Sequence, residues 1–236
     1  MNFLFDLYGT LADIHTDEKK KELWNGCASL LGESDGERIR EEYHSLCKRY
    51  EDAKEHRFVE FDLLSVFEKM LEARGLPIEK APELARSFRI LSRERLMLFP
   101  CVTDILTELK RRGAGVYLVS NAQACFTEDE LYELGIAACF DGILISSDAG
   151  VKKPHREIFD IAAQRFGIEL KDCIYVGNDL HDDILGASGA GLETVYIETE
   201  QSGKYPGLDV IPTYAVKDHE EMKRLLLSLA EDGNDK

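Results

Sequence analysis

Short apolar segments alternate with longer amphipathic segments along most of this chain. Five of the short segments are apolar enough to form buried strands, at residues 2–5, 115–119, 142–146, 173–177 and 193–197. Helix-spaced apolar residues fill the intervals at 102–109 and 158–166, and the two patterns end at Gly113 and Gly167. Strands that alternate with helices and are apolar on both faces predict an α/β fold with a doubly wound parallel sheet.

The stretch from residue 16 to about residue 96 contains no run typical of a buried strand. Four helical faces are expected there instead. Their apolar residues are Leu23, Cys27, Leu30 and Leu31; Ile39, Tyr43, Leu46 and Tyr50; Leu64, Phe67 and Leu71; and Leu84, Phe88 and Leu91. We therefore expect an all-helical cap domain at residues 15–96, inserted into a core domain made of residues 1–14 and 97–236.

Two capping boxes indicate where helices begin. Ser34 with Glu37 precedes the second helical face of the insert. Thr127 with Glu130 predicts the start of a short helix that ends at Gly135.

The composition excludes several classes of partner. The chain of 236 residues carries 29 Lys and Arg against 45 Asp and Glu, a formal charge of −16. Such a surface repels phosphate backbones and anionic lipids, and no apolar run approaches the roughly 20 residues that span a bilayer. The N-terminus has no basic region before Asp6. We expect a cytoplasmic monomer or homodimer that acts on a small molecule and binds neither nucleic acid nor membrane.

Polar residues follow the predicted strands at the points where those strands end. The carboxyl ends of parallel strands meet at one edge of a sheet, which is where ligands of such folds bind. The residues expected to meet there are Asp6, Ser120, Asn121, Lys153, Asn178, Asp179 and Asp183.

The charges within this set indicate a cation site. Asp6, Asp179 and Asp183 carry three negative charges and Lys153 carries one positive charge, so a partly buried site would keep an excess of two negative charges. Such a site either raises carboxylate pKa values or binds a divalent cation. A ligand set made only of oxygen atoms favours Mg²⁺ over zinc or copper.

Four motifs occur in a fixed order at these strand ends: DLYGTL at 6–11, VSN at 119–121, KKPHREIF at 152–159 and VGNDLHDDILGA at 176–187. With these motifs the chain resembles the haloacid dehalogenase superfamily, in the subgroup with a helical cap inserted after the first strand. The resemblance covers the whole chain and implies a hydrolase with a nucleophilic aspartate.

The resemblance implies a role for each motif residue. Asp6 would attack phosphorus and form an aspartyl-phosphate that water then hydrolyses. Ser120, beside Asn121, would bind the phosphoryl oxygens, and Lys153 would pair with Asp6 and with those oxygens. Gly9 would shape the turn that exposes Asp6.

The same resemblance implies phosphate and metal contacts. Thr10 would complete the turn with its neighbouring glycine. The backbone carbonyl of Tyr8 and an acid of the last motif would hold Mg²⁺ together with the nucleophile. Asn178 stands where the first acid of that motif is usual, and Asp179 and Asp183 are the acids that could take its place.

Tyr8 departs from the pattern of phosphatases in this superfamily, which carry a second aspartate two residues after the nucleophile as general acid. Losing that acid should slow phosphomonoester cleavage by about 10² to 10⁴. A halide leaves without a proton, and DxYGT is the form found in haloacid dehalogenases. His15, His56 and Tyr8 itself are candidates to supply the missing proton.

The two departures favour different reactions. Tyr8 favours metal-independent hydrolysis of a 2-haloacid, which also needs a cap arginine; Arg38, Arg40, Arg49 and Arg57 are available. The acidic last motif favours Mg²⁺ and phosphoryl chemistry, because gathered carboxylates without a cation are unfavourable. We give the metal site more weight and expect a Mg²⁺-dependent phosphatase acting on a small phosphorylated metabolite. The alternatives are the dehalogenase and a non-catalytic phosphate-binding homologue.

Overall fold

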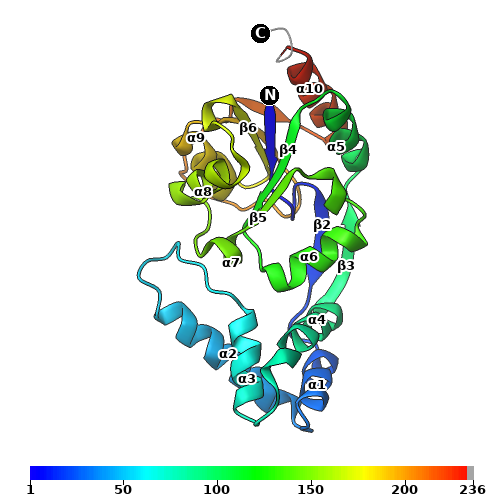
Figure 1. The fold of residues 1–236 in the computed structure, drawn as a ribbon, viewed down its shortest axis with the longest axis vertical. Helices are drawn as coiled ribbons and strands as arrows, with labels where there is room; N and C mark the ends of the chain where they lie inside the picture. The colour runs from blue at the N-terminus through cyan, green and yellow to red at the C-terminus, as the bar shows by residue number, and fades with distance from the viewer. Residues whose placement is uncertain (233–236) are drawn as a thin grey trace.

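The computed structural model describes residues 1–232, and its centre is a parallel sheet (Figure 1). Within these residues six strands pair in the order β5-β4-β1-β6-β7-β8. They are β1 (Asn2–Phe5), β4 (Gly115–Ser120), β5 (Gly142–Ile145), β6 (Cys173–Gly177), β7 (Glu193–Ile197) and β8 (Tyr214–Val216). All the pairs are parallel, and the five apolar runs form strands as predicted. The short β8 was not predicted.

Helices cover both faces of this sheet, as a doubly wound fold requires (Figure 1). Phe3 and Phe5 of β1 pack on the side of α5 (Val102–Arg111) and α10 (His219–Asp232). Leu4 points to the other face and packs with α8 (Arg156–Phe166) and α9 (Gly186–Ala190). β1 is therefore buried from both sides and places its carboxyl end in the middle of the molecule.

Several short elements connect these layers. They are α6 (Ala124–Glu133), η2 (Ala137–Cys139), α7 (Ser146–Ala149), η3 (Leu170–Asp172) and the π-helix η4 (Leu180–Leu185). We call the sheet with all of these helices the core.

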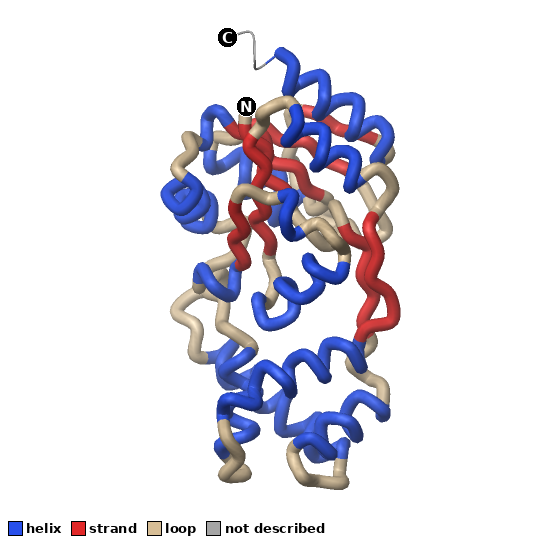
Figure 2. The backbone as a smooth tube through the Cα atoms, turned by 45° about the vertical axis from the view of Figure 1, so that its right-hand side comes forward, coloured by secondary structure: helices blue, strands red, loops and turns tan. Residues whose placement is uncertain are grey.

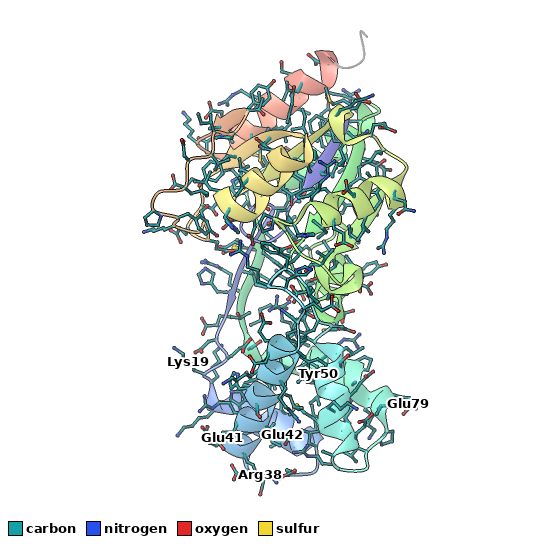
Figure 3. All side chains as sticks on the ribbon, turned by 90° about the vertical axis from the view of Figure 1, so that its left-hand side faces the viewer. Lys19, Arg38, Glu41, Glu42, Tyr50 and Glu79 are labelled. Carbon is teal, nitrogen blue, oxygen red and sulfur yellow. The ribbon has the colours of Figure 1, made fainter. Side chains whose placement is uncertain are left out.

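The cap is a separate helical layer at the other end of the molecule (Figures 1 and 3). It consists of α1 (Lys21–Leu30), α2 (Gly36–Asp52), α3 (Leu64–Glu72), η1 (Ile78–Lys80) and α4 (Ala81–Ser92). Trp24, Tyr43, Phe67 and Phe88 form its buried aromatic centre. Most residues of the four predicted faces are buried there, whereas Leu30 and Leu91 are exposed.

A two-stranded antiparallel ribbon joins core and cap (Figure 2). β2 (Ala12–Thr16) leads into the cap and β3 (Arg93–Leu98) returns from it. The prediction that residues 16 to about 96 contain no strand was wrong, because β3 begins at Arg93. Its residues alternate between half-buried and exposed, so the segment lacks the apolar run of a buried strand. Both proposed domain boundaries fall inside this ribbon.

Both capping boxes were misplaced. The side chain of Asp35, not of Ser34, accepts the backbone N–H of Arg38 at the start of α2. α6 begins at Ala124, so Thr127 and Glu130 lie inside the helix and are buried. Thr127 donates to the carbonyl of Gln123 within α6, and Glu130 binds Arg89 of the cap. The local spacing does not reveal either partner.

α6 is the core helix that contacts the cap. The ring of Phe126 stacks on Phe88 of the cap, with centroids 6.0 Å apart. Next to it, the carboxylate of Glu130 binds the guanidinium of Arg89 at 2.7 Å, and only 2% of the Glu130 side chain is exposed. An apolar contact and a buried ion pair therefore fix α4 against α6.

The loop between α2 and α3 makes a second contact with the core. The backbone N–H of Glu60 donates to the carbonyl of Gly150, and that of Lys152 donates to the carbonyl of Phe58, both at 2.9 Å. Val59 and Val151 form an antiparallel bridge between these bonds. The cap thus touches the core directly beside the motif that contains Lys153.

No helix within residues 1–232 is both long and apolar enough to cross a membrane.

Replacing Glu130 by Gln tests the contact between cap and core. The change leaves the Arg89 guanidinium without its buried counter-charge, so the free energy of unfolding should fall by about 3 kcal/mol. The control is Asp129→Asn on the same helix, where an exposed pair with Arg86 is lost and the fall should stay below about 1 kcal/mol. Urea denaturation measures both; equal losses would contradict the assignment.

Candidate active site

The turn after β1 presents Asp6 at the carboxyl edge of the sheet. The backbone N–H of Asp6 still donates to Val176 of β6, and the chain then turns back so that Leu11 and Ala12 donate to the carbonyl of Leu7. Gly9 has φ +87°, and a Cβ there would lie 2.4 Å from the amide nitrogen of Asn178. The turn therefore requires glycine at this position, both for its conformation and for its contact.

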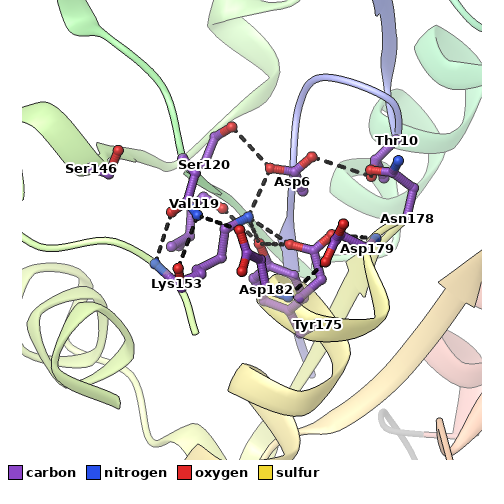
Figure 4. Close-up of polar contacts among 12 residues, drawn as sticks. Asp6, Thr10, Val119, Ser120, Ser146, Lys153, Tyr175, Asn178, Asp179 and Asp182 are labelled. Atoms are coloured by element: carbon purple, nitrogen blue, oxygen red, sulfur yellow. Dashed lines mark hydrogen bonds and ion pairs between the residues drawn. The ribbon is translucent and has the colours of Figure 1, made fainter. Parts of the chain in front are cut away.

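Two donors hold one oxygen of the Asp6 carboxylate (Figure 4). Its Oδ1 accepts hydrogen bonds from Ser120 Oγ at 2.9 Å and from Lys153 Nζ at 2.8 Å. Its Oδ2 has one long contact, 3.4 Å from Thr10 Oγ1. One oxygen is therefore anchored and the other is available. Asp6 is 7% exposed, so its carboxylate lies in a largely dehydrated site.

Lys153 is a fully buried cation at the centre of the site. Its ammonium donates to Asp6, to Asp183 Oδ1 at 2.7 Å and to the Tyr175 hydroxyl at 2.7 Å. The Tyr175 hydroxyl in turn donates to the carbonyl of Val119 at 2.7 Å. All three ammonium protons therefore have partners, which satisfies the charge without water.

Burial and the neighbouring charges shift the pKa values of Lys153 and Asp183. Burial alone would lower the pKa of Lys153, but the carboxylates of Asp183 and Asp6 outweigh it and raise that pKa well above its usual value. Burial raises the pKa of Asp183 to about 7, although Lys153 opposes the shift. Lys153 thus stays charged as the counter-ion of the carboxylates beside it.

Asn121 fixes the backbone that carries Lys153. Its Oδ1 accepts the backbone N–H of Lys153 at 2.8 Å, and its Nδ2 donates to the Lys153 carbonyl at 3.1 Å. The same Nδ2 donates to Asp182 Oδ2 at 3.1 Å. Asn121 therefore positions the lysine and connects it to the last motif.

Asp179 begins the π-helix η4, and this geometry gathers the acids of the last motif. Its Oδ1 accepts the backbone N–H groups of His181 and Asp182, and its Oδ2 accepts the hydroxyl of Tyr205 at 2.6 Å. Asp183 Oδ2 accepts the backbone N–H of Asp179 at 2.9 Å. The π-helix and the turn that leads into it thereby place Asp179, Asp182 and Asp183 at one edge of the sheet.

Asn178 is buried and supports the turn after Asp6. Its Oδ1 accepts the hydroxyl of Thr10 at 3.0 Å (Figure 4). The hydroxyl of Thr199 donates to the carbonyl of Gly9 at 3.0 Å and holds the same turn from another side.

These side chains enclose a cavity of about 150 Å³. The residues that line it are Asp6, Tyr8, Ser120, Asn121, Lys153, Asn178, Asp179, Asp182, Asp183 and Gln201. Eight of the predicted site residues are among them; Gly9 and Thr10 support the turn from outside. Asp182 and Gln201 were not among the predicted residues. Gln201 comes from a loop after β7 that carries no motif.

The hydroxyl of Tyr8 binds α6 and not the nucleophile. It donates to Glu130, and the Thr127 hydroxyl lies 3.1 Å away. Burial, and then the charge of Glu130, raise the pKa of Tyr8 above its usual value. Arg89 lies over the ring, 5.7 Å from its centroid. The structure thus gives the Tyr8 hydroxyl a role between core and cap and corrects the prediction that it could donate a proton to a substrate.

The other predicted proton donors and the cap arginines lie elsewhere. His15 is on the ribbon with 46% of its side chain exposed, and His56 stacks on His155 at a centroid distance of 5.3 Å. Among the residues lining the cavity there is no arginine. Arg38 lies at the end of the cap remote from the core (Figure 3). The remaining candidates also lie outside the lining; they are Arg40, Arg49 and Arg57.

The cavity has the donor set of a divalent cation site. Four carboxylates and one ammonium line it, so negative charge is in excess. Ligand atoms of Asp179, His181 and Asp182 lie within 4.8 Å of one another, although the ring Nδ1 of His181 already bonds Asp182 Oδ1 at 2.6 Å. The remaining donors are oxygen atoms, which suits Mg²⁺.

The chain belongs to the haloacid dehalogenase-like hydrolases, because the model of that family matches residues 1–191. It is 33% identical to a phosphoserine phosphatase of Thermus thermophilus over 133 residues, which are 56% of this chain and 53% of the relative. It is 31% identical to a glyceraldehyde 3-phosphate phosphatase of Methanothermobacter thermautotrophicus over 134 residues, 57% of this chain and 54% of that protein. The matched region therefore spans about half the length of each curated relative.

Solved structures share the fold over almost the whole chain. A 2-haloacid dehalogenase from Pseudomonas syringae superposes with a TM-score of 0.65 at 22% identity, covering 96% of this chain and 98% of that chain. A haloacid dehalogenase-family phosphatase from Thermococcus onnurineus superposes with a TM-score of 0.61 at 20% identity, covering 95% and 97%. The same fold thus occurs in proteins with both kinds of name and does not decide between them.

Replacing Lys153 by Met tests the central ion cluster. Asp6 and Asp183 would lose their buried counter-ion, so we expect the free energy of unfolding to fall by about 3–5 kcal/mol. The matched control is Lys152→Met. Lys152 is partly exposed and lies 3.8 Å from Glu60, so its loss should change stability by no more than about 0.5 kcal/mol. Denaturation curves that coincide for the two variants would refute the assignment of Lys153 to the site.

Proposed function

We propose that this protein is a Mg²⁺-dependent phosphatase that hydrolyses a small phosphorylated metabolite through an aspartyl-phosphate on Asp6. The observation that carries the proposal is the Asp6 carboxylate, anchored through Oδ1 by Lys153 and Ser120 at the edge of a cavity lined by three further acids. We further propose that the protein is cytoplasmic and is a monomer or a homodimer. Its substrate is a small molecule, and it binds neither nucleic acid nor membrane.

The chain's own residues account for the nucleophile. Lys153 supplies the counter-charge of Asp6, and the bonds to Oδ1 orient the carboxylate so that Oδ2 is the attacking oxygen. Ser120 Oγ lies 2.9 Å from the carboxylate and therefore within reach of a phosphoryl group placed against it. Asn121 holds the backbone of Lys153 in place, so that the ammonium stays beside Asp6 during the reaction.

The acids of the last motif would hold the metal. Asp179 and Asp182, with Asp6 and the backbone carbonyl of Tyr8, are the residues proposed to bind it. Asp183 is already bound to Lys153 and to the backbone of Asp179, and Asn178 to Thr10, so both are assigned to support. When bound, Mg²⁺ offsets the repulsion between the carboxylate and an incoming phosphate.

The names of the relatives support a phosphatase acting on small substrates. They include phosphatases of phosphoserine, glyceraldehyde 3-phosphate and ribulose-1,5-bisphosphate. The cap lies over the carboxyl edge of the sheet, which limits access for large substrates.

Tyr8 is the observation that favours a 2-haloacid dehalogenase as the second candidate. That reaction needs a cationic receptor for halide and carboxylate, and the cavity lining contains no arginine. Its four acids would also repel a carboxylate substrate in the absence of a cation. Phosphoryl chemistry is therefore the better fit to this site.

Turnover of 4-nitrophenyl phosphate tests the proposed function. We expect hydrolysis with Mg²⁺, loss of activity in EDTA, and a fall of about 10³-fold or more in Asp6→Asn. Asp104→Asn, which changes an exposed acid on α5, is the control and should retain activity. Tight binding of phosphate ligands or Mg²⁺, with no turnover and no beryllofluoride adduct on Asp6, would identify a non-catalytic homologue instead.

Halide release tests the second candidate. A 2-chloro acid incubated with the protein in EDTA should yield no chloride above the uncatalysed rate, because the lining offers no arginine to bind the leaving halide. Ion chromatography measures the chloride. Release that persists in EDTA and disappears in Asp6→Asn would replace the phosphatase assignment with the dehalogenase.

A further inference from the structure

Cleavage of an ordinary phosphate ester needs a proton for the departing alkoxide, and the proton donors that line the cavity already have partners. The ammonium of Lys153 has three partners. The hydroxyl of Ser120 donates to Asp6, and the amide of Gln201 donates to Asp13. The amide protons of Asn121 and Asn178 are not acidic and have partners as well. None of these groups is a free acid.

The acids in the lining act as hydrogen-bond acceptors. Asp179 accepts three hydrogen bonds, through both of its oxygens. Asp183 accepts from Lys153 with one oxygen and from a backbone N–H with the other. Asp182 accepts from Asn121 through Oδ2, while Oδ1 lies against the ring of His181. Both oxygens of each of these three acids are therefore engaged in contacts, so none of the acids has an unengaged oxygen from which to pass a proton to a leaving group.

Tyr8 occupies the position from which an acid would serve the leaving group, and its proton is engaged elsewhere. The hydroxyl donates to Glu130, a buried carboxylate that also pairs with Arg89 and Arg93. If the hydroxyl released this proton toward the cavity, the buried carboxylate of Glu130 would lose one of its hydrogen-bond donors, which is unfavourable.

We propose that the substrate of this site carries a leaving group that departs without a proton: an acyl phosphate, an enol phosphate or an aryl phosphate, rather than the phosphate ester of an alkyl alcohol. The proposal rests on the proposed phosphatase function and narrows its substrate class.

The reaction balances without a general acid. Asp6 Oδ2 forms a bond to phosphorus while the bond from phosphorus to the leaving oxygen breaks, and the electron pair departs with a carboxylate, enolate or phenolate. Water then adds to phosphorus, the bond from phosphorus to Asp6 breaks, and the carboxylate of Asp6 is restored. Both protons of the water leave with inorganic phosphate, as dihydrogen phosphate. In each step the group that departs is a stable anion.

A pair of substrates that differ by one methylene measures this preference. 4-Nitrophenyl phosphate releases a phenolate, and 4-nitrobenzyl phosphate releases an alkoxide of nearly the same shape. A general acid is worth about 10² to 10⁴ in rate. We expect kcat/KM for the benzyl ester to be at least about 10²-fold lower, and acetyl phosphate to be turned over at least as well as the phenyl ester.

Two variants test whether the side chain at position 8 sets the preference between the phenyl and benzyl esters. Tyr8→Asp places a carboxyl group at this position and should raise kcat/KM for the benzyl ester relative to the phenyl ester by about tenfold or more. Tyr8→Phe should leave the ratio of the two substrates unchanged, whatever its effect on turnover. A selective loss of the benzyl ester in Tyr8→Phe would overturn the proposal, because it would make the Tyr8 hydroxyl the acid.

The outcomes separate the proposal from the function on which it rests. If none of the phosphates is hydrolysed with Mg²⁺, the phosphatase function fails and the substrate class fails with it. If the wild-type protein hydrolyses phenyl and benzyl esters with similar kcat/KM, the phosphatase function stands and the proposed substrate class is wrong. The wild-type ratio decides this even if Tyr8→Asp does not fold.

Discussion

The buried ammonium of Lys153 is the interaction on which the site depends. It joins the turn after β1, the strand β6 and the helix η4, because its three protons reach Asp6, Tyr175 and Asp183. A carboxylate in such a dehydrated position is unfavourable without a counter-charge. One cation therefore supplies the counter-charge for two buried acids, and its hydrogen bonds hold together the backbone segments that carry them.

The two departures from the family pattern have structural roles of their own. Tyr8 replaces a proton donor to the substrate with a hydroxyl that connects the nucleophile turn to Glu130 and, through Arg89, to the cap. Asn178 replaces an acid with a neutral acceptor for Thr10, packed against Gly9. Both side chains therefore support the turn after β1 and do not take the direct chemical role that the family pattern gives to an acid at these positions.

The buried strands and the order of the motifs were predictable because they depend on local composition and on a rule of sheet geometry. The apolar run 2–5 is buried on both faces, and the residues that follow such runs meet at one edge. The polar ribbon strand β3 and the burial of Glu130 depend on tertiary contacts. The same is true of Gln201, which reaches the site from a loop without a motif. These partners are distant in the sequence, so the local pattern of residues does not predict them.

The ribbon of β2 and β3 has a consequence for how substrate enters. Both covalent connections between cap and core run side by side as one hydrogen-bonded pair of strands, so the cap can move as a body about this ribbon (Figure 2). At the opposite margin the loop at residues 56–60 contacts residues 150–155 through backbone bonds, through the stacked rings of His56 and His155 and through the pair of Glu60 with Lys152. A cap that swings about the ribbon would separate this margin first, so substrate would enter next to the segment that carries Lys153.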